Sequence, residues 1–249
     1  SEALPGKSFG QIYGTDYVHV NPNDQTSALL INDVPGAGYG YPIVGSKSVA
    51  LGNTQPKWIG GLSNTFTYKN LSLGVIMSIR EGGDIWDGTL GAMEYFGTAD
   101  QTSNRNGTEV FAGNMGHLDG SGNVVHQTSA TTTASGAGAT NSTAAATNEY
   151  YWQNIGGSFV GPSSTAVFDG SYVRISQINL SYELPKRIVR KAHFTRIALT
   201  AYATNPFLWT KYPGVDPETS LAGPANGQGL DYFNNPGTKS YGLRLNLGL

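Results

Sequence analysis

The chain has 249 residues, of which 39% are hydrophobic, 13% are charged and 34 are glycine. This charged fraction is about half of the ~25% that is typical of soluble domains, and glycine is roughly twice as frequent as usual. A net charge of -2 gives no electrostatic reason to bind nucleic acid or an anionic membrane surface, and the absence of cysteine excludes disulfides and thiolate chemistry. No apolar run approaches the ~18 residues of a membrane-spanning helix.

Alternation of apolar and polar residues predicts six β-strands. In chain order they are residues 9–20, 58–68, 71–80, 172–183, 194–203 and 240–249. Only Lys69 and Asn70 separate the second strand from the third, which predicts a tight hairpin. Each run is close to the roughly 9 to 11 residues that a tilted strand needs to cross a bilayer.

The connections between these strands alternate in length. Residues 69–70 and 184–191 are short connections, whereas 21–57, 81–170 and 205–239 are long. Short turns on one side and long loops on the other are typical of an outer-membrane barrel. Residues 127–147 contain 7 Thr, 7 Ala and 3 Ser with no large apolar side chain, so we expect them to lack regular structure.

The second short connection is strongly basic. Its four cationic residues are Lys186, Arg187, Arg190 and Lys191. We interpret it as a solvated turn with one helical turn after Pro185, and attachment to a membrane surface is the alternative.

The predicted fold class is all-β: an antiparallel transmembrane β-barrel portion with long external loops. Six strands cannot close even the smallest bacterial membrane barrel, which has 8. An open edge in lipid leaves backbone N–H and C=O groups unpaired, at several kcal/mol each. We therefore expect residues 1–249 to be the carboxy-terminal part of a larger barrel, or to pair with another polypeptide that supplies the missing strands.

Several ordered motifs carry a family resemblance. They are GNTQPKWIGGLSN at 52–64, YKNLSL at 68–73, REGGDI at 80–85, YVRI at 172–175, SYELP at 181–185, NP at 205–206 and TKYPGVDPE at 210–218. With these motifs the chain resembles the carboxy-terminal part of the SusC/RagA-like TonB-linked outer-membrane transporters of Bacteroidetes. The resemblance extends over nearly all of the chain except residues 95–165.

The resemblance implies a barrel of 22 strands in the bacterial outer membrane, plugged by an amino-terminal domain and covered by a SusD-like surface lipoprotein. Such transporters import oligosaccharides or peptides with energy supplied through TonB, which would act through the amino-terminal part. The plug domain and most strands are absent from this sequence, and its last residue, Leu249, is not the aromatic residue with which these barrels usually end.

Candidate contact residues lie in the long connections. Asp84 and Trp86 follow a strand near the external rim, where a carboxylate and an aromatic ring suit a sugar; a glycine turn and an interfacial aromatic are the alternative. The aromatic residues Tyr150, Tyr151, Trp152, Trp209 and Tyr212 suit stacking on a ligand or contact with a lipoprotein, and packing within the loops is the alternative.

No catalytic, metal or cofactor site is predicted. His117 and His126 have no carboxylate at metal-ligand spacing. Asp216 and Glu218 flank Pro217, and a proline-fixed turn is favoured over a glycosidase pair. The sequence therefore predicts a non-enzymatic part of an importer. Two rivals remain: a soluble extracellular β-sandwich that binds carbohydrate, with its apolar faces packed into a core, and a β-rich hydrolase.

Overall fold

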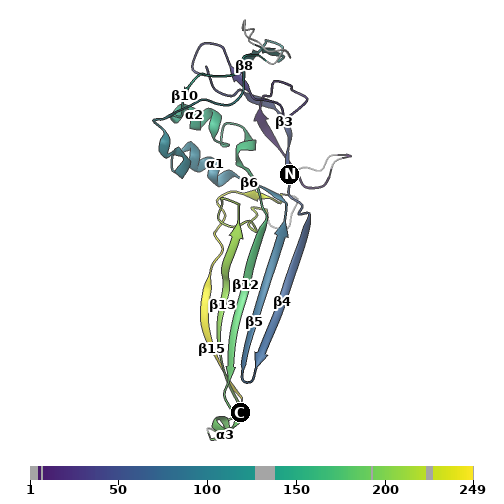
Figure 1. Ribbon diagram of the computed structural model, residues 1–249, viewed down its shortest axis with the longest axis vertical. Helices are drawn as coiled ribbons and strands as arrows, with labels where there is room; N and C mark the ends of the chain where they lie inside the picture. Colours follow the sequence, from purple (N-terminus) through teal and green to yellow (C-terminus); the bar gives the residue numbers. More distant parts are fainter. Residues whose placement is uncertain (1–4, 7, 127–137, 192, 223–226, 249) are drawn as a thin grey trace.

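The computed structural model describes residues 5–6, 8–126, 138–191, 193–222 and 227–248. Figure 1 shows two parts: a long five-stranded sheet and, above it, an upper lobe of shorter strands and helices. The lobe is formed by the amino-terminal segment and the long connections. The short turns of the sheet, helix α3 and the carboxy terminus lie at the opposite end. Among the described residues, no helix has the length and apolar content needed to cross a membrane.

The five-stranded sheet is antiparallel, with the strand order β15-β13-β12-β5-β4. Its strands are β4 (Trp58–Tyr68), β5 (Leu71–Glu81), β12 (Tyr172–Glu183), β13 (Arg196–Thr210) and β15 (Ser240–Gly248). All six predicted segments contain a strand, and five of these strands form the long sheet. The two-residue hairpin at Lys69 and Asn70 is confirmed by the pairing of Tyr68 with Leu71. Helix α3 (Lys186–Lys191) confirms the helical turn after Pro185.

The prediction that residues 9–20 form a strand of the same sheet was wrong. This segment contains β1 (Gln11–Tyr17), which pairs antiparallel with β3 (Val44–Asn53) in a separate two-stranded sheet. Strand β3 itself lies in a segment that was expected to be a connection. Alternation shows that a strand has two different faces, but it does not identify its partner, which long-range contacts select. The described part of the long sheet consequently has five strands.

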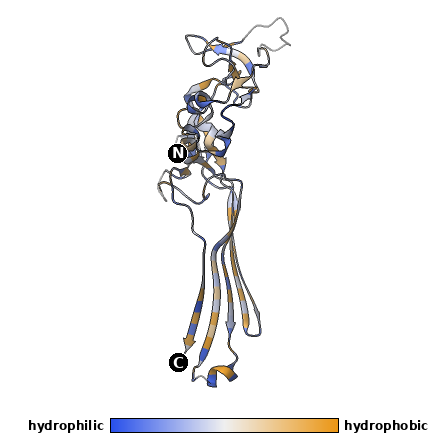
Figure 2. Cartoon of the chain, turned by 90° about the vertical axis from the view of Figure 1, so that its left-hand side faces the viewer, coloured by the Kyte–Doolittle hydropathy of each residue, from blue (hydrophilic) through white to orange (hydrophobic). Residues whose placement is uncertain are grey.

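The register of the long sheet gathers apolar side chains on one face and polar side chains on the other. One row across all five strands is Phe66, Leu73, Leu180, Ala201 and Leu243. The adjacent row, on the opposite face, is Thr67, Ser72, Ser181, Thr200 and Arg244. Figure 2 shows the resulting alternation of hydrophobic and hydrophilic residues along the strands. Hydroxyl contacts such as Ser181 to Thr200, at 2.9 Å, link the strands on the polar face.

A β-bulge at Ser176 keeps this division intact along β12. Toward the turns, the apolar face of β12 contains even-numbered residues such as Ile178. Toward the upper lobe, it contains odd-numbered residues such as Ile175. The register shift between Ile175 and Gln177 absorbs the extra residue. Without the bulge, every side chain above Ser176 would point to the wrong face.

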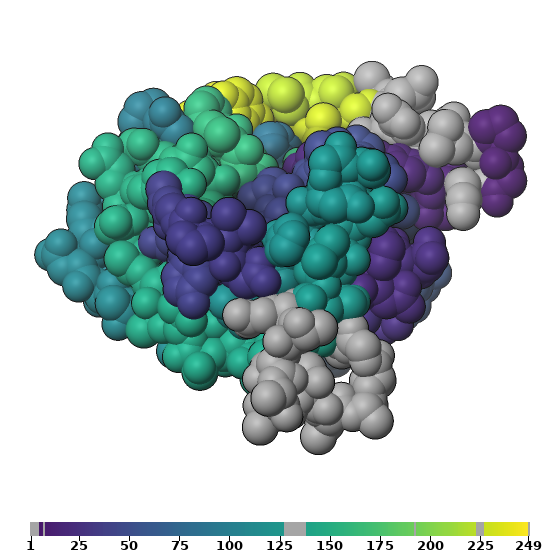
Figure 3. Space-filling model, turned by 90° about the horizontal axis from the view of Figure 1, so that it is seen from above, coloured from purple at the N-terminus to yellow at the C-terminus, as the bar shows by residue number. Residues whose placement is uncertain are grey.

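The upper lobe is assembled from short elements that lie far apart in the sequence. Its strands besides β1 and β3 are β2 (Leu30–Asn32), β6 (Asp84–Asp87), β7 (Thr108–Glu109), β8 (Asn114–Leu118), β9 (Val124–His126), β10 (Ala145–Ala146), β11 (Val167–Asp169) and β14 (Leu230–Asp231). Helices α1 (Gly88–Tyr95) and α2 (Glu149–Tyr151) join them, with a π-helical turn at Trp152–Gly156 and 3-10 turns at Asp100–Asn104 and Ser163–Ala166. From above, early residues lie beside residues near 110–126, in agreement with the parallel pairing of β2 and β8 (Figure 3).

The core of the lobe explains why the expectation for residues 127–147 was wrong over its second part. Residues 127–137 lie outside the described residues. Beyond them, β10 pairs with β7, and Ala145 is buried in a cluster with Ile31, Tyr41, Phe111, Met115 and Ile155. Small side chains fit here because large aromatic rings fill the core. The hydroxyl of Tyr41 also donates a 2.6 Å hydrogen bond to the carbonyl of Ala146.

Asn141 provides a test of this packing. Its buried amide donates to the carbonyl of Phe111 at 2.9 Å and accepts from the backbone of Thr143 at 2.9 Å. Asn141→Ala leaves buried backbone groups without a partner, so we expect the upper lobe to lose about 1–3 kcal/mol of stability. The measurement is the denaturant dependence of limited proteolysis of the lobe. Ser142→Ala, at an exposed neighbour, is the control; equal effects of the two substitutions would contradict the structural role of Asn141.

Candidate functional site

Asp84 supports the junction between the sheet and the lobe. It follows Gly82 and Gly83, both with positive φ, which turn the chain after β5. A Cβ on Gly83 would lie 2.8 Å from the carbonyl oxygen of Thr54, so the turn requires glycine. One carboxylate oxygen of Asp84 accepts a 2.7 Å hydrogen bond from the backbone N–H of Asn53 at the end of β3. The side chain is therefore engaged within the protein.

Trp86 lies on β6, between β11 and β14. Its ring stacks on Tyr232, with centroids 6.4 Å apart and planes 21° apart. Its indole N–H is buried and has no hydrogen-bond partner among the described residues. Both residues of the predicted Asp84–Trp86 pair thus contribute to the internal packing of the junction.

The three aromatic residues at 150–152 divide into core and surface. Tyr151 stacks on Tyr41 with an interplanar angle of 16°, and its centroid is 5.1 Å from that of Phe111, so it belongs to the core of the lobe. Burial raises the pKa of the Tyr151 phenol to about 12. Tyr150 is exposed. Trp152 lines a cavity of about 330 Å³, shared with Glu94, Phe96 and Arg105.

Trp209 lies apart from the other candidates, on the apolar face of the long sheet. It pairs with Val173 and stacks on Phe207 at 5.8 Å with planes 14° apart, and 53% of its surface is exposed. An exposed aromatic pair at the upper end of an apolar face resembles the aromatic girdle of a membrane protein. The sequence indicates Trp86 as the alternative girdle residue, but Trp86 stacks on Tyr232 and Trp209 lies on the apolar face.

Tyr212 lies in a buried polar cluster that sequence reasoning did not find. It is 4% exposed and donates a 2.7 Å hydrogen bond to Asp231. Asp231 is paired in register with Asp87, and the two carboxyl residues are 1% and 2% exposed. One oxygen of Asp87 accepts from the backbone N–H of Leu90 at 2.9 Å and caps helix α1. We call Asp87, Tyr212 and Asp231 the acid cluster.

The acid cluster holds two carboxyl groups where water does not screen them. Burial raises the pKa of Asp87 above its ordinary value of 3.8, and the charge of Asp231 raises it further. Burial and the hydrogen bond to Asp231 likewise raise the pKa of Tyr212. The second oxygen of Asp231 is buried without a partner among the described residues.

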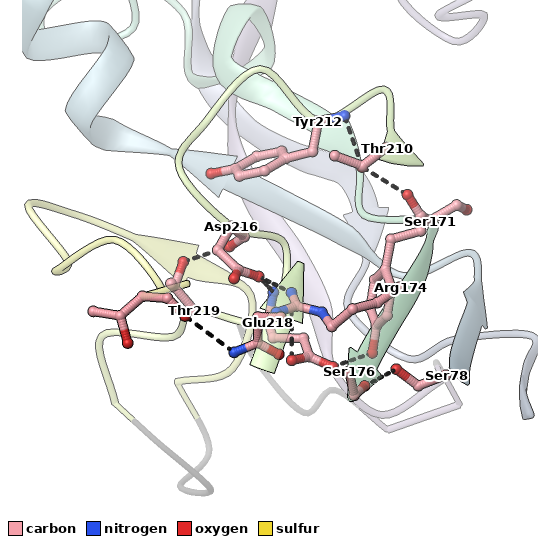
Figure 4. A network of polar contacts seen from close by, with 12 residues as sticks. Ser78, Ser171, Arg174, Ser176, Thr210, Tyr212, Asp216, Glu218 and Thr219 are labelled. Carbon is pink, nitrogen blue, oxygen red and sulfur yellow. Dashed lines mark hydrogen bonds and ion pairs between the residues drawn. The ribbon is translucent and has the colours of Figure 1, made fainter. Parts of the chain in front are cut away.

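A second cluster lies on the polar face at the upper end of the sheet. Figure 4 shows Arg174, on β12, pointing toward Asp216 and Glu218 in the loop after β13. The guanidinium is 2.5 Å from Asp216 and 3.4 Å from Glu218. The Tyr172 hydroxyl donates to Glu218, and Asp216 also accepts from the backbone N–H of Glu218 at 2.9 Å.

This second cluster determines what Asp216 and Glu218 can do. Both carboxylates bind one arginine, and the backbone around Pro217 folds into a turn that the Thr219 hydroxyl closes on the Asp216 carbonyl at 2.7 Å. The proline-fixed turn is therefore present. Sequence reasoning missed Arg174. The sequence feature that could have indicated it is a charged residue between two apolar residues, Val173 and Ile175, on a predicted strand.

His117 is bound to Asp33 at 2.9 Å instead of facing His126. Among the described residues, no group of three or more His, Asp or Glu side chains is arranged to hold a metal ion. The long sheet presents one apolar and one polar face, and the Arg174 cluster lies at the upper end of the polar face.

No protein-family model matches the chain. Its sequence is similar to TonB-dependent receptor P3 of Formosa agariphila, with 24% identity over 97% of this chain and 22% of that protein. Its fold is similar to that of the RagAB peptide transporter, with a TM-score of 0.51, 14% identity and coverage of 96% of this chain and 24% of that chain.

A second solved structure gives the same result. The RagAB peptide importer in the open-open state matches with a TM-score of 0.51, 16% identity and coverage of 100% of this chain and 24% of that chain. The resemblance to SusC/RagA-like transporters is supported in sequence and in fold. The chain spans about a quarter of the length of the proteins that it matches.

The acid cluster predicts a pH dependence of the upper lobe. Because the pKa of Asp87 is raised in the fold, its contribution to stability is complete below the ordinary value of 3.8 and is lost as the pH rises through the raised value. Asp87→Asn preserves the helix cap and removes the charge. We expect this variant to be more stable than the wild type at pH 8 and to lose that advantage toward pH 4. Limited proteolysis across this pH range measures the difference; a difference that does not change with pH would contradict the assignment.

The Arg174 cluster predicts unequal effects of its two carboxylates. The Asp216 side chain is buried, whereas that of Glu218 is 46% exposed. Asp216→Asn weakens a buried ion pair and should destabilise the loop by about 2–4 kcal/mol, whereas Glu218→Gln should cost at most about 1 kcal/mol. The measurement is protease sensitivity of residues 211–222. If Glu218→Gln has the larger effect, the burial argument fails.

Proposed function

We propose that this chain forms part of the β-barrel of an outer-membrane TonB-dependent importer of oligosaccharides or peptides, which works with a SusD-like surface lipoprotein. It is a non-enzymatic component. The observation that carries the proposal is the division of the five-stranded sheet into one apolar and one polar face over its whole width. The apolar face contacts lipid and the polar face lines the interior.

The exposure of the apolar face supports contact with lipid. Leu243 is 74% exposed and Phe66 is 60% exposed, although both are large apolar side chains in the middle of strands. A continuous surface of this kind is unfavourable in water and favourable in a bilayer. The strands have 9 to 15 residues, which meets the roughly 9 to 11 needed to cross the hydrocarbon layer.

The open edges of the sheet support a larger barrel. Among the described residues, β4 pairs with β5 alone, and β15 pairs with β13 alone. Unpaired backbone groups on such edges are costly in lipid, so neighbouring strands must complete the barrel. The remainder of the same transporter is the source that we propose, because the similar proteins are about four times as long. The plug and the TonB-contacting segment would belong to that remainder.

The rival β-sandwich agrees less well with the structure. A sandwich requires a second sheet about 10 Å above the apolar face. The other described sheets have two or three strands and lie in the upper lobe, beyond the end of the long sheet (Figure 1). The hydrolase reading is also weaker, because Asp216 and Glu218 both bind Arg174.

The upper lobe is the external part of the proposed importer. Within it, Tyr150 and Trp152 remain candidates for contact with a solute or the lipoprotein, because both have accessible surface. Tyr151 and Tyr212 support those surfaces from the core. Of the two solute classes, a peptide is supported by the likeness to a peptide importer. The proposal of a lipoprotein partner rests on the family resemblance.

Two positions on β15 test the proposal. Leu243 lies on the apolar face opposite Ala201, and Asn246 lies on the polar face opposite Ala198. Arginine facing lipid near mid-membrane costs about 2–4 kcal/mol, whereas arginine facing the interior costs little. In the full-length protein, we expect Leu243→Arg to reduce the heat-modifiable folded barrel strongly and Asn246→Arg to leave it nearly unchanged. Equal assembly of the two variants would refute the lipid-facing assignment.

A further inference from the structure

The charges of the chain are unevenly distributed between its two ends. At the turn end of the long sheet, residues 68–71 and 183–197 hold six basic residues and one acidic residue, Glu183. The six, which we call the basic collar, are Lys69, Lys186, Arg187, Arg190, Lys191 and Arg196. This leaves nine of the 15 basic residues and 16 of the 17 acidic residues for the rest of a chain whose net charge is -2.

Hydrogen bonds hold the two turns of the collar together. The backbone N–H of Glu183 donates to the carbonyl of Asn70 at 2.8 Å, and the Asn70 amide donates to the carbonyl of Glu183 at 2.7 Å. The backbone N–H of Leu184 donates a hydrogen bond to the carbonyl of Ile197 at 2.9 Å. Val189 is buried and anchors α3. The collar is therefore fixed at the end of the sheet, where Figure 1 places α3.

Most of the positive charge of the collar is not neutralised within the described protein. Arg196 pairs with Glu183 at 3.1 Å. None of the other five residues forms an ion pair with any described residue, and all five are exposed. Five cations close together repel one another, so the arrangement favours an external anionic partner.

The collar continues directly from the apolar face. The last row of that face that spans all five strands contains Tyr68 and Tyr182, which flank Leu71, and Tyr68 is 72% exposed. Within α3, Ile188 is 53% exposed between basic residues. Tyrosine is typical of the boundary between hydrocarbon and headgroups, and basic side chains extend beyond that boundary. Toward the turn end of the sheet, the apolar side chains are thus followed by tyrosines and then by the basic side chains of the collar.

We infer that the basic collar binds the phosphate groups of anionic phospholipids in the membrane leaflet at the turn end of the sheet. This inference rests on the proposed function, because it requires the apolar face to lie in lipid. Continuity with that face favours a lipid surface over a soluble anionic partner. Each basic residue near an anionic membrane surface contributes roughly fivefold in affinity at moderate salt.

The experiment uses the full-length protein, folded and purified in detergent. It is equilibrated with an equimolar mixture of phosphatidylglycerol and phosphatidylcholine, and the lipids retained are counted by native mass spectrometry. The test variant carries Lys186→Gln, Arg187→Gln, Arg190→Gln and Lys191→Gln. We expect the wild type to retain phosphatidylglycerol preferentially, and we expect the variant to lose at least about tenfold of that preference. Higher ammonium acetate concentration should weaken the preference of the wild type.

A matched control removes the same charge from the other end of the chain. It carries Lys47→Gln, Lys57→Gln, Lys211→Gln and Lys239→Gln, and it should retain the preference of the wild type. If both variants lose the preference equally, net charge explains the effect and the collar assignment is overturned. Displacement of the lipid by millimolar inorganic phosphate would also overturn it, because the site would then bind free phosphate.

Heat modifiability separates this inference from the proposed function. A folded, membrane-inserted barrel without preference for phosphatidylglycerol refutes the collar alone, whereas equal assembly of the two β15 variants refutes the proposed function. If the fourfold variant fails to fold, the double variant Lys186→Gln and Lys191→Gln takes its place, since both side chains are exposed. Unchanged lipid preference in the folded double variant would refute the inference.

Discussion

The division between the apolar and polar faces depends on strand register. Side chains alternate along a strand, so a slip of one residue in any pair would move a whole set of apolar side chains to the opposite face. The pairings of Phe66, Leu73, Leu180, Ala201 and Leu243 form an unbroken apolar row across five strands. The bulge at Ser176 preserves this division in β12. The apolar residues change there from even to odd positions, and the extra residue of the bulge keeps them on the same face.

The upper lobe depends on the sheet through polar side chains at the end of the strands. Arg174 projects from β12 on the polar face and binds Asp216, which fixes the loop after β13 over that face. Tyr212, from the same loop, binds Asp231 beside Asp87, which caps α1. Two long connections, residues 81–170 and 205–239, are thereby joined close to the point where they leave the sheet. A change at one cluster should therefore affect loops that are remote in sequence.

The sequence predicts well what local periodicity determines. The strands of the long sheet, the hairpin at Lys69 and Asn70 and the turn after Pro185 follow from alternation and turn chemistry within a few residues. The pairing of β1 with β3 does not, because a two-faced strand is compatible with several partners. Ala145 was missed for a related reason: a small residue becomes part of a core when Tyr41 and Phe111 from distant segments pack around it.

The candidate residues show the same limit more sharply. Aromatic content identified Tyr151, Trp209 and Tyr212 as candidates for contact, but it could not predict their locations. Tyr151 lies in the core of the lobe, Trp209 lies on the apolar face of the sheet, and Tyr212 makes a buried hydrogen bond to a carboxylate. Asp87 and Asp231 lie 144 positions apart, and no local signal brings them together. Only the parallel pairing of β6 and β14 does so. The pKa of Asp87 is raised by burial and, further, by the charge of Asp231, and both causes depend on the three-dimensional arrangement.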